Sequence, residues 1–472
     1  MSPTLAIITS SIIMLAIGVG ISIYIGKKQK GIENWNVGGR SLPMYVIAGT
    51  QFATGVGGGV LVAHVGIGYH AGWSAFTYNL LYSLGIVVLI LFAGWLKKHQ
   101  FSTLPDIFKK LYGEHKVLIS TVTLLSIVVP FGWLCTQLVA FGNLFTEITG
   151  ISFTLLVVIF AFISILFVLP GGMASVAWTD FLFGCFMLIL SIATGLYILN
   201  FAGGWSEIVA NVPEKSISFP QGMGAVGLTT IILWTFAIFP GALTNQMSYQ
   251  RIYSAKDPKS ARQGFVIAAI AGLISGLWAS FMGIAIHSLN PNLDNPEMAA
   301  GWFLTQVPTW FLAIYSAFII ATIISTVSSA VQSVVVNITN DIYKSYINPN
   351  VNEKTLVKYS RILTVFIIIL ALILALYYPQ ALGWLQATYA YSAAGLLVPI
   401  FLGIFLRKTK LLSVKGALGG TFSGVVGVAI AQILNTTIPY SVYGVVCSLI
   451  GFLLFSAIYR NKELDKGKVT NI

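Results

Sequence analysis

Thirteen apolar runs follow one another along this chain, with only short polar segments between them. A transmembrane α-helix needs about 20 predominantly apolar residues to cross a hydrocarbon core of ~30 Å. Only 8% of the 472 residues are charged, which excludes a soluble domain of this size. We therefore predict an all-α polytopic membrane protein with 13 transmembrane helices, spans 1 to 13, at residues 4–26, 44–68, 72–95, 117–146, 151–170, 174–200, 224–246, 264–288, 303–339, 359–378, 382–406, 413–434 and 440–459.

The basic residues between the spans predict their orientation. With the N-terminus outside, 25 of the 26 Lys and Arg residues fall in inner loops, inner span ends or the C-terminal tail, and only Lys215 falls outside. Cytoplasmic loops carry such an excess of Lys and Arg, and a miscounted span would invert every later loop. The pattern therefore predicts a C-terminus inside and a multi-pass protein of the cell membrane.

Other function classes are disfavoured by the sequence. The net charge of +12 is spread over short loops, which does not indicate a nucleic-acid partner. The three Cys residues lie inside apolar runs and suggest neither a disulfide framework nor a metal set. No cluster of His, Asp and Glu and no nucleophile–base arrangement indicates an enzyme. We expect neither catalysis nor a bound cofactor.

Two Gly-containing membrane segments lie five spans apart, FATGVGGG at 52–59 and FPGALTNQ at 239–246. Corresponding broken helices in two halves indicate a transporter with inverted repeats and a binding site near the midplane. Close packing of glycine faces is the alternative. The expected division is 1–43 (span 1 and an inner loop), 44–200 (first five-helix repeat, spans 2–6), 201–410 (second five-helix repeat, spans 7–11) and 411–472 (spans 12 and 13 and a cytoplasmic tail).

Hydroxyl side chains form a stripe in the otherwise apolar span 9. They recur at helical spacing, so one face of a helix carries Thr322, Ser325, Thr326, Ser329 and Ser333. Hard cations such as Na⁺ prefer oxygen ligands, which this stripe supplies without a buried net charge. Hydrogen bonds to the helix's own carbonyls are the alternative use of such residues.

Asp180 lies a turn or two inside span 6, whereas the other acidic residues lie in loops or at span ends. A carboxylate within a membrane is costly unless it is paired or solvated, so Asp180 is a candidate functional residue. Its span contains no Lys or Arg, which suits a monovalent cation as its partner. A helix-dipole role near the start of span 6 is the alternative.

Four motifs follow one another over spans 2 to 9: GGRSLP (38–43), GGMASVAWTD (171–180), NQMSYQRIYSAKD (245–257) and ATIISTVSSAVQSVVVNITNDIY (321–343). In sequence and order they resemble those of the sodium:solute symporter family, whose members transport sugars, proline, pantothenate, sialic acid or choline. The resemblance implies a LeuT-like 5+5 inverted-repeat core.

The resemblance also implies the ligands of the transported ion. A sodium site would use carbonyl oxygens of the broken span 2 and carbonyl and hydroxyl oxygens of span 9, here those of Ala53, Val56, Thr322, Ser325 and Thr326. Some members bind a second sodium ion, for which the matching residues are Asp180, Ser328 and Ser329.

For the solute, the family uses the unwound part of span 2 and faces of spans 3, 4, 7 and 11. Gly55 stands where choline-type members carry a Trp and proline-type members an acid, so the chain matches neither group in full. On the spans that the family uses, the resemblance implies a solute site formed by Gly57, Gly58, Tyr82, Trp133, Asn245, Gln246 and Gln386.

We predict a secondary transporter that couples inward sodium flow to the symport of a small polar organic solute by alternating access, and that works as a monomer in the bilayer. Arg251, in the QR motif that ends span 7, is interpreted as an interfacial anchor or gate charge. Proton-coupled symport through Asp180 is the alternative, and a gated channel is a third hypothesis from another class.

Overall fold

The computed structural model describes residues 3–28 and 31–459, and within these ranges every regular element is helical. The membrane part comprises α1 (Pro3–Lys28), α3 (Met44–Gly58), η2 (Gly59–His64), α4 (Val65–Ala71), α5 (Ser74–Lys98), α7 (Lys116–Ser126), α8 (Val128–Thr149), α9 (Phe153–Val168), α10 (Met173–Phe201), α13 (Leu228–Leu243), α14 (Gln246–Ser254), α15 (Pro258–Leu289), α17 (Thr309–Asn337), η5 (Ile338–Ile347), α18 (Glu353–Tyr377), α19 (Ala381–Ser392), η6 (Ala393–Leu397), α20 (Val398–Leu406), α21 (Val414–Ile433) and α22 (Tyr440–Ile458). The connections contain α2 (Ile32–Val37), η1 (Gly38–Arg40), α6 (Pro105–Tyr112), α11 (Trp205–Ala210), α12 (Glu214–Ile217), η3 (Gln221–Gly224), η4 (Pro296–Met298) and α16 (Ala299–Thr305).

Within the described ranges, twelve helical stretches are long and apolar enough to cross a membrane. The predicted fifth span corresponds to α9, which is apolar but only 16 residues long. At 1.5 Å per residue it rises about 24 Å, less than the ~30 Å of a typical hydrocarbon core. The count of thirteen spans and the sides of the two termini remain predictions.

The predicted ninth span begins later than expected. We predicted 303–339, but residues 303–305 belong to the separate helix α16, and α17 begins at Thr309. Pro308 directly precedes α17, and a proline disfavours the helical conformation of the residue before it. Helix α17 therefore begins after Pro308 instead of continuing from α16.

Both predicted breaks are present. Helix α3 is interrupted at Gly57, whose φ of 1° and ψ of −166° lie outside the helical region. The seventh span divides into α13 and α14 at Thr244 and Asn245, and the Asn245 side chain caps α14 by accepting a hydrogen bond from the Met247 amide at 3.0 Å. Two helices are therefore broken inside the bundle, as the glycine-containing segments predict.

The two stretches that carry most of the predicted site lie at the centre of the bundle. In their most apolar windows, 89% of Met44–Ala71 and 83% of Thr309–Ile347 are buried, against 28–67% for the other ten stretches. Helix α3 packs against α10, α15 and α17, so its broken segment is surrounded by other helices. Such burial suits a site from which water must be excluded.

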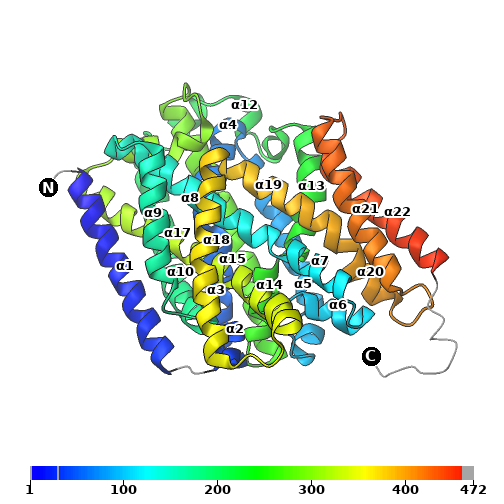
Figure 1. Cartoon of the computed structure of the whole chain (residues 1–472). Helices are drawn as coiled ribbons and strands as arrows, with labels where there is room; N and C mark the ends of the chain where they lie inside the picture. Colours follow the sequence, from blue (N-terminus) through cyan, green and yellow to red (C-terminus); the bar gives the residue numbers. More distant parts are fainter. Residues whose placement is uncertain (1–2, 29–30, 460–472) are drawn as a thin grey trace.

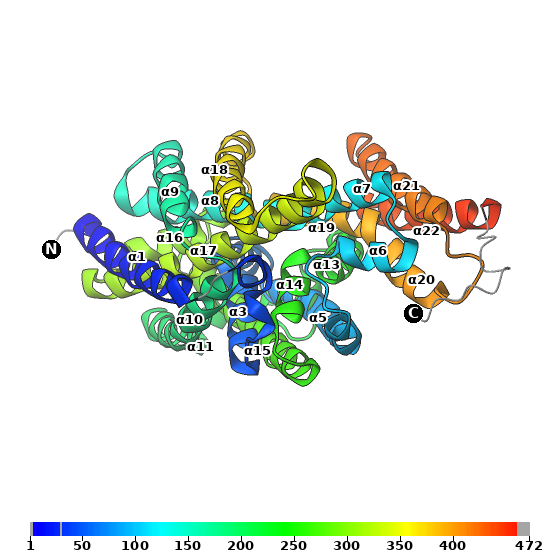
Figure 2. The same ribbon diagram turned by 60° about the horizontal axis from the view of Figure 1, so that its bottom comes forward.

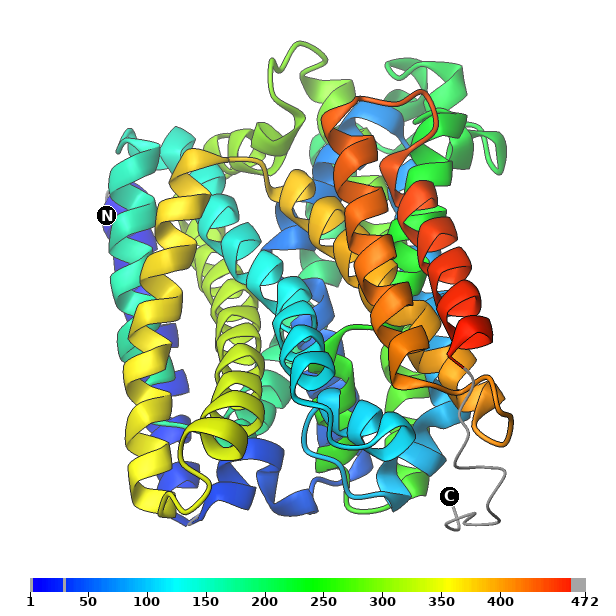
Figure 3. The same ribbon diagram turned by 45° about the vertical axis from the view of Figure 1, so that its right-hand side comes forward.

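Peripheral helices flank this core. Helix α1 packs against α17 and α10, while α21 and α22 pair with each other and contact η6 (Figure 1). Figure 2 shows α1 and the α21–α22 pair at opposite edges of the molecule. Figure 3 shows α21 and α22 running side by side. The short helices α2 and α6 lie at the end of the bundle opposite α12 (Figure 1).

Candidate functional site

The break in α3 meets the hydroxyl stripe of α17 at Thr326. Its Oγ1 lies 3.3 Å from the Ala53 carbonyl oxygen and 3.3 Å from the Thr322 carbonyl oxygen of its own helix. Ser325 Oγ donates to the same Thr322 carbonyl at 3.0 Å. Four of the five residues predicted to bind sodium therefore converge on one buried point, with oxygen atoms from two helices.

The fifth predicted ligand, Val56, lies one turn further along α3, and its carbonyl accepts a hydrogen bond from the Gly59 amide. The Thr54 carbonyl, which was not predicted, lies 3.3 Å from Thr326 Oγ1. A helix break frees several neighbouring carbonyls, and the sequence motif alone does not decide which of them turns toward α17.

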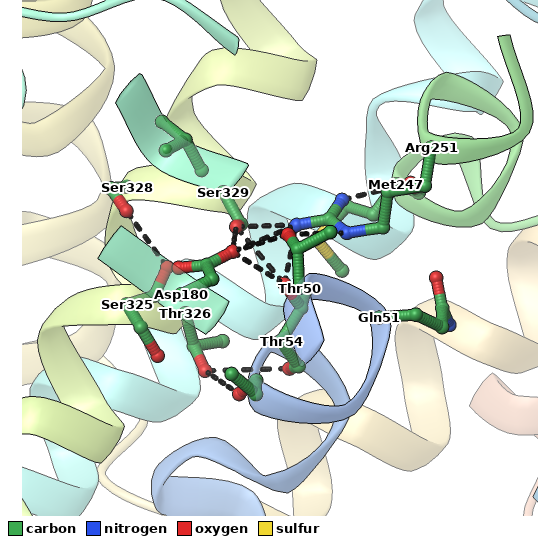
Figure 4. Close-up of polar contacts among 12 residues, drawn as sticks. Thr50, Gln51, Thr54, Asp180, Met247, Arg251, Ser325, Thr326, Ser328 and Ser329 are labelled. Carbon is green, nitrogen blue, oxygen red and sulfur yellow. Dashed lines mark hydrogen bonds and ion pairs between the residues drawn. The ribbon is translucent and has the colours of Figure 1, made fainter. Parts of the chain in front are cut away.

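The predicted second ion site is also brought together in part. Asp180 is fully buried, and its Oδ2 accepts hydrogen bonds from Thr50 at 2.7 Å and from Ser329 at 2.9 Å. Thr54 Oγ1 lies 3.3 Å from the same oxygen (Figure 4). Ser328 instead donates to the Ser325 carbonyl at 2.8 Å. Asp180 and Ser329 are thus in contact, with Thr50 and Thr54 as partners that sequence reasoning missed.

The structure shows that the interpretation of Arg251 as an interfacial anchor is wrong. It is fully buried, and its Nη2 lies 3.3 Å from Asp180 Oδ2 and 2.6 Å from Ser329 Oγ, and it also donates to Thr54 Oγ1. Figure 4 shows the guanidinium pointing into the group of oxygens around Asp180. A buried carboxylate requires a positive partner, so Asp180 could have prompted a search for a basic residue. Its own span contains none, and the partner comes from a distant part of the sequence.

Gly57 and Gly58 lie where α3 packs closely against α8 and α17. The Gly58 amide donates to Gln137 Oε1 at 2.5 Å. A Cβ at Gly58 would lie 2.5 Å from the Ala140 Cβ and 3.0 Å from Gln137 Oε1. Gln137 was not predicted, although it is a buried amide one turn from Trp133 on α8.

Aromatic residues lie beside these glycines. Trp133 Nε1 donates to the Tyr389 hydroxyl at 2.9 Å, and a Cβ at Gly59 would lie 3.3 Å from the Trp133 ring. The Tyr82 and Tyr389 rings are 6.3 Å apart. Two predicted solute residues, Trp133 and Tyr82, are therefore linked through Tyr389, which sequence reasoning missed.

Two other predicted solute residues lie elsewhere. Gln246 Oε1 accepts a hydrogen bond from the Leu104 amide at 2.7 Å, in the segment that leads into α6. Gln386 lines a cavity of about 410 Å³ together with His70 and Glu297. In these contacts, neither side chain meets the Trp133–Tyr389 pair.

Glu297 joins three elements at this cavity. Its carboxylate accepts hydrogen bonds from the Ala381 amide at 3.0 Å, the Leu382 amide at 2.9 Å and Asn143 Nδ2 at 3.2 Å. Burial raises the pKa of Glu297, and these hydrogen bonds only partly oppose that shift. The carboxylate thereby caps the start of α19 and ties it to α8.

Lys109 on α6 makes a second connection between distant elements. Its Nζ lies 2.9 Å from Asp106 Oδ1 and 3.0 Å from Oδ1 of Asp341, a fully buried residue of η5. Burial lowers the pKa of Lys109, but the Asp341 and Asp106 carboxylates outweigh this effect and raise it above its ordinary value. The ammonium therefore stays charged between two carboxylates.

Comparisons with solved structures identify the fold. A Na⁺-coupled sialic acid symporter, solved in a substrate-bound outward-open state, superimposes with a TM-score of 0.82 over 97% of this chain and 98% of that chain at 18% identity. MhsT, solved in complex with L-phenylalanine, gives a TM-score of 0.55 over 88% of this chain and 97% of that chain at 14% identity. The protein thus has the LeuT-like fold that the motifs imply.

Comparisons of sequence agree. The sodium/glucose cotransporter of Vibrio parahaemolyticus is 24% identical over 91% of this chain and 85% of the relative. The sodium/proline symporter of Salmonella typhimurium is 25% identical over 96% of this chain and 94% of the relative. The model of the sodium:solute symporter family matches residues 35–424, so this chain belongs to the sodium:solute symporter family.

Proposed function

We propose that a sodium ion binds where α3 breaks against α17 and drives the uptake of a small polar organic solute by alternating access. The observation that carries the proposal is the position of Thr326 Oγ1, 3.3 Å from both the Ala53 and the Thr322 carbonyl oxygens. Two carbonyls of α3, the Thr322 carbonyl and two hydroxyls would give five neutral oxygen ligands, from Ala53, Val56, Thr322, Ser325 and Thr326.

Such a site couples the ion to the conformation of the transporter. Its ligands belong to two helices that must stay together for the ion to bind, so sodium favours the arrangement in which α3 and α17 touch. A solute that binds the same arrangement is then favoured by the ion, and the ion by the solute. Rocking of the core would release both on the other side of the membrane.

We place the solute beside Gly57 and Gly58, next to Trp133 and Tyr82. The aromatic rings offer an apolar face, while the Tyr389 hydroxyl and the Gln137 amide offer polar contacts nearby. Relatives named for glucose, proline and sialic acid all carry small polar solutes, which supports the same class here. One chain contains all of these residues, so we expect a monomer to be sufficient.

Proton coupling through Asp180 is less well supported than sodium coupling. Asp180 Oδ2 lies 3.3 Å from Arg251 Nη2 in a fully buried pair. Protonating the carboxylate would leave the guanidinium as an uncompensated buried charge, which is strongly unfavourable. The pair therefore favours an Asp180 that stays ionised through the cycle.

The test is uptake into proteoliposomes. Labelled sugars, amino acids, pantothenate, choline and carboxylates are screened for accumulation driven by an inward sodium gradient, and the solute found is used for variants. Ser325→Ala and Thr326→Ala should each raise the half-maximal sodium concentration about tenfold, a loss of ~1.4 kcal/mol. Ser360→Ala and Thr421→Ala, which remove buried hydroxyls that donate to backbone carbonyls elsewhere, serve as matched controls.

Unchanged sodium dependence in both site variants would contradict the proposed ligands. Uptake that only equilibrates the solute across the membrane would instead indicate a channel, and uptake in sodium-free buffer at acid pH would indicate proton coupling.

A further inference from the structure

A cavity of about 530 Å³ lies at the end of the bundle where α2 is found (Figure 1). It opens among the end of α1, helix α2, the connection between α9 and α10, and the start of α18. Its wall includes Gly26, Trp35, Pro170, Lys354, Val357 and Arg361. No residue of the proposed sodium or solute site lines this cavity, so it requires an explanation of its own.

One face of α18 gives the cavity its charge. Lys354, Val357 and Arg361 follow one another at i, i+3 and i+7, so a helix places them on the same side. Within residues 3–28 and 31–459, neither basic side chain forms an ion pair with a carboxylate. Glu353 also lines the cavity, but its Oε2 accepts a hydrogen bond from the Ile32 amide at 3.3 Å. The wall therefore carries more positive than negative charge, which suits an anion.

Trp35 adds a neutral donor to these charges. Its indole Nε1 is buried and has no hydrogen-bond acceptor among the described residues. A buried donor without an acceptor is unfavourable, and an oxygen of a bound anion would relieve it. The Arg361 guanidinium lies 5.9 Å from the centre of the Trp35 ring, so the ring also helps to position this cation. Three donor groups from two elements thus meet at one cavity.

Apolar surfaces next to the cavity indicate what else the ligand contains. Ile23, one turn before Gly26 on α1, is 40% exposed, and Ile362 and Phe366, which follow Arg361 on α18, are 56% and 60% exposed. On membrane helices, such side chains face the acyl chains of lipids, and the charged and Trp residues beside them lie at the level of the head groups. An inorganic anion would fill only the polar part of this surface.

We propose that this cavity binds an anionic phospholipid, with the phosphate of its head group at Lys354, Arg361 and Trp35 and its acyl chains along α1 and α18. Such a lipid joins α2 to α18. Helix α2 is already held to α17, because Gln332 Nε2 donates to the Trp35 carbonyl at 2.5 Å. The lipid therefore fastens a peripheral helix to the central one from outside the transport sites, and the inference does not depend on the proposed function.

The experiment measures lipid binding to the purified full-length protein in a neutral detergent by native mass spectrometry. Phosphatidylglycerol and phosphatidylcholine with the same acyl chains are titrated separately, and phosphatidylglycerol should bind at least about tenfold more tightly. The double variant Lys354→Gln with Arg361→Gln should lose this preference, and Trp35→Phe, which keeps a ring but removes the N–H, should weaken it. Lys358→Gln is the matched control, because Lys358 is exposed on the same helix but does not line the cavity.

Three results would overturn the inference. The first is equal binding of the two lipids to the wild type, and the second is an unchanged preference in the double variant. The third is displacement of phosphatidylglycerol by inorganic phosphate at millimolar concentration, which would indicate a site for a soluble anion. If the double variant does not fold, Trp35→Phe and the competition with phosphate decide. A loss of preference in Lys358→Gln as large as in the double variant would show a general surface charge effect and also contradict the site.

Discussion

Glu297 shows what a single partly buried carboxylate does in this protein. It accepts hydrogen bonds from two backbone amides at the start of α19 and from the side chain of Asn143 on α8. Losing this carboxylate would leave three donors without their acceptor, and each unsatisfied buried donor costs about 1–3 kcal/mol. Burial also disfavours the ionised form of Glu297, which raises the pKa of this carboxyl.

We therefore expect the stability of the protein to depend on pH through Glu297. A raised pKa in the folded state means that the folded protein binds the proton more tightly, so this contribution is present at low pH and is lost as pH rises through the folded-state pKa. Thermal unfolding in detergent should show the wild type gaining stability relative to Glu297→Gln as the pH falls from 7 toward the ordinary pKa of a glutamate, about 4.3. Glu297→Ala should be less stable than both at pH 7. An exposed control, Glu214→Gln, should follow the wild type, and parallel curves for the wild type and Glu297→Gln would contradict the assignment.

At the scale of an element, the broken α3 depends on the absence of side chains at its break. A Cβ at Gly58 would lie 2.5 Å from the Ala140 Cβ, closer than packed atoms come, and 3.5 Å from the Ile323 side chain of α17. The contact with Ile323 would be an ordinary one, but helix α3 can approach α8 this closely only if residue 58 is glycine. The carbonyl of Ala53, a proposed sodium ligand, lies on the same helix, so its position against α17 depends on how α3 packs.

Gly58→Ala should push α3 away from α8. Overpacking of this kind costs about 1–3 kcal/mol, so we expect a lower unfolding temperature and a sodium requirement raised roughly tenfold or more. Gly20→Ala is the matched control, because a Cβ at this exposed position of α1 meets no atom within 4 Å. Both are read from sodium-driven uptake in proteoliposomes. Equal sodium dependence in the two variants would show that the close approach is not needed.

At the scale of the whole molecule, polar contacts join elements that are far apart in sequence. Lys109 connects α6 to η5 through Asp341, and the Leu104 amide just before α6 donates to Gln246 at the start of α14. These contacts link a connecting helix to two membrane segments, one of which follows a helix break. A movement of either membrane segment away from α6 would therefore have to break one of these contacts.

Lys109→Met should leave Asp341 unpaired in a fully buried position. Breaking a buried pair costs about 3–5 kcal/mol, and we expect the lower end because about a fifth (21%) of the Lys109 side chain is exposed. The unfolding temperature should fall, and Asp341→Asn in the same chain should restore most of it. Lys110→Met, on the exposed side of α6, should behave as wild type. No rescue by Asp341→Asn would argue against the ion pair as the cause.

Several of these features could be predicted from sequence because they are local. The glycine-containing segments predicted both helix breaks, and helical spacing placed Thr322, Ser325 and Thr326 on one face. The meeting of that face with Ala53 was implied by the family motifs. Such patterns report which residues share an element or a face, and the membrane leaves few alternatives for apolar runs of this length.

The remaining features depend on which faces meet across helices. Arg251 lies in the polar segment QMSYQR, which reads as the end of a span, yet α14 carries it into the core beside Asp180. The side-chain oxygen of Gln246 accepts a hydrogen bond from the Leu104 amide just before α6, which gives this buried amide an acceptor. Tyr389 lies in the site through its hydrogen bond to Trp133 and its ring contact with Tyr82, which no spacing along the chain encodes.

The buried pair of Asp180 and Arg251 also bears on how far the transporter can concentrate its solute. Both charges stay with the protein, so only transported sodium contributes to the driving force. For an uncharged solute, a tenfold sodium gradient supplies about 1.4 kcal/mol and a membrane potential of 100 mV about 2.3 kcal/mol per charge. Each sodium ion transported with the solute therefore permits accumulation of about 400-fold.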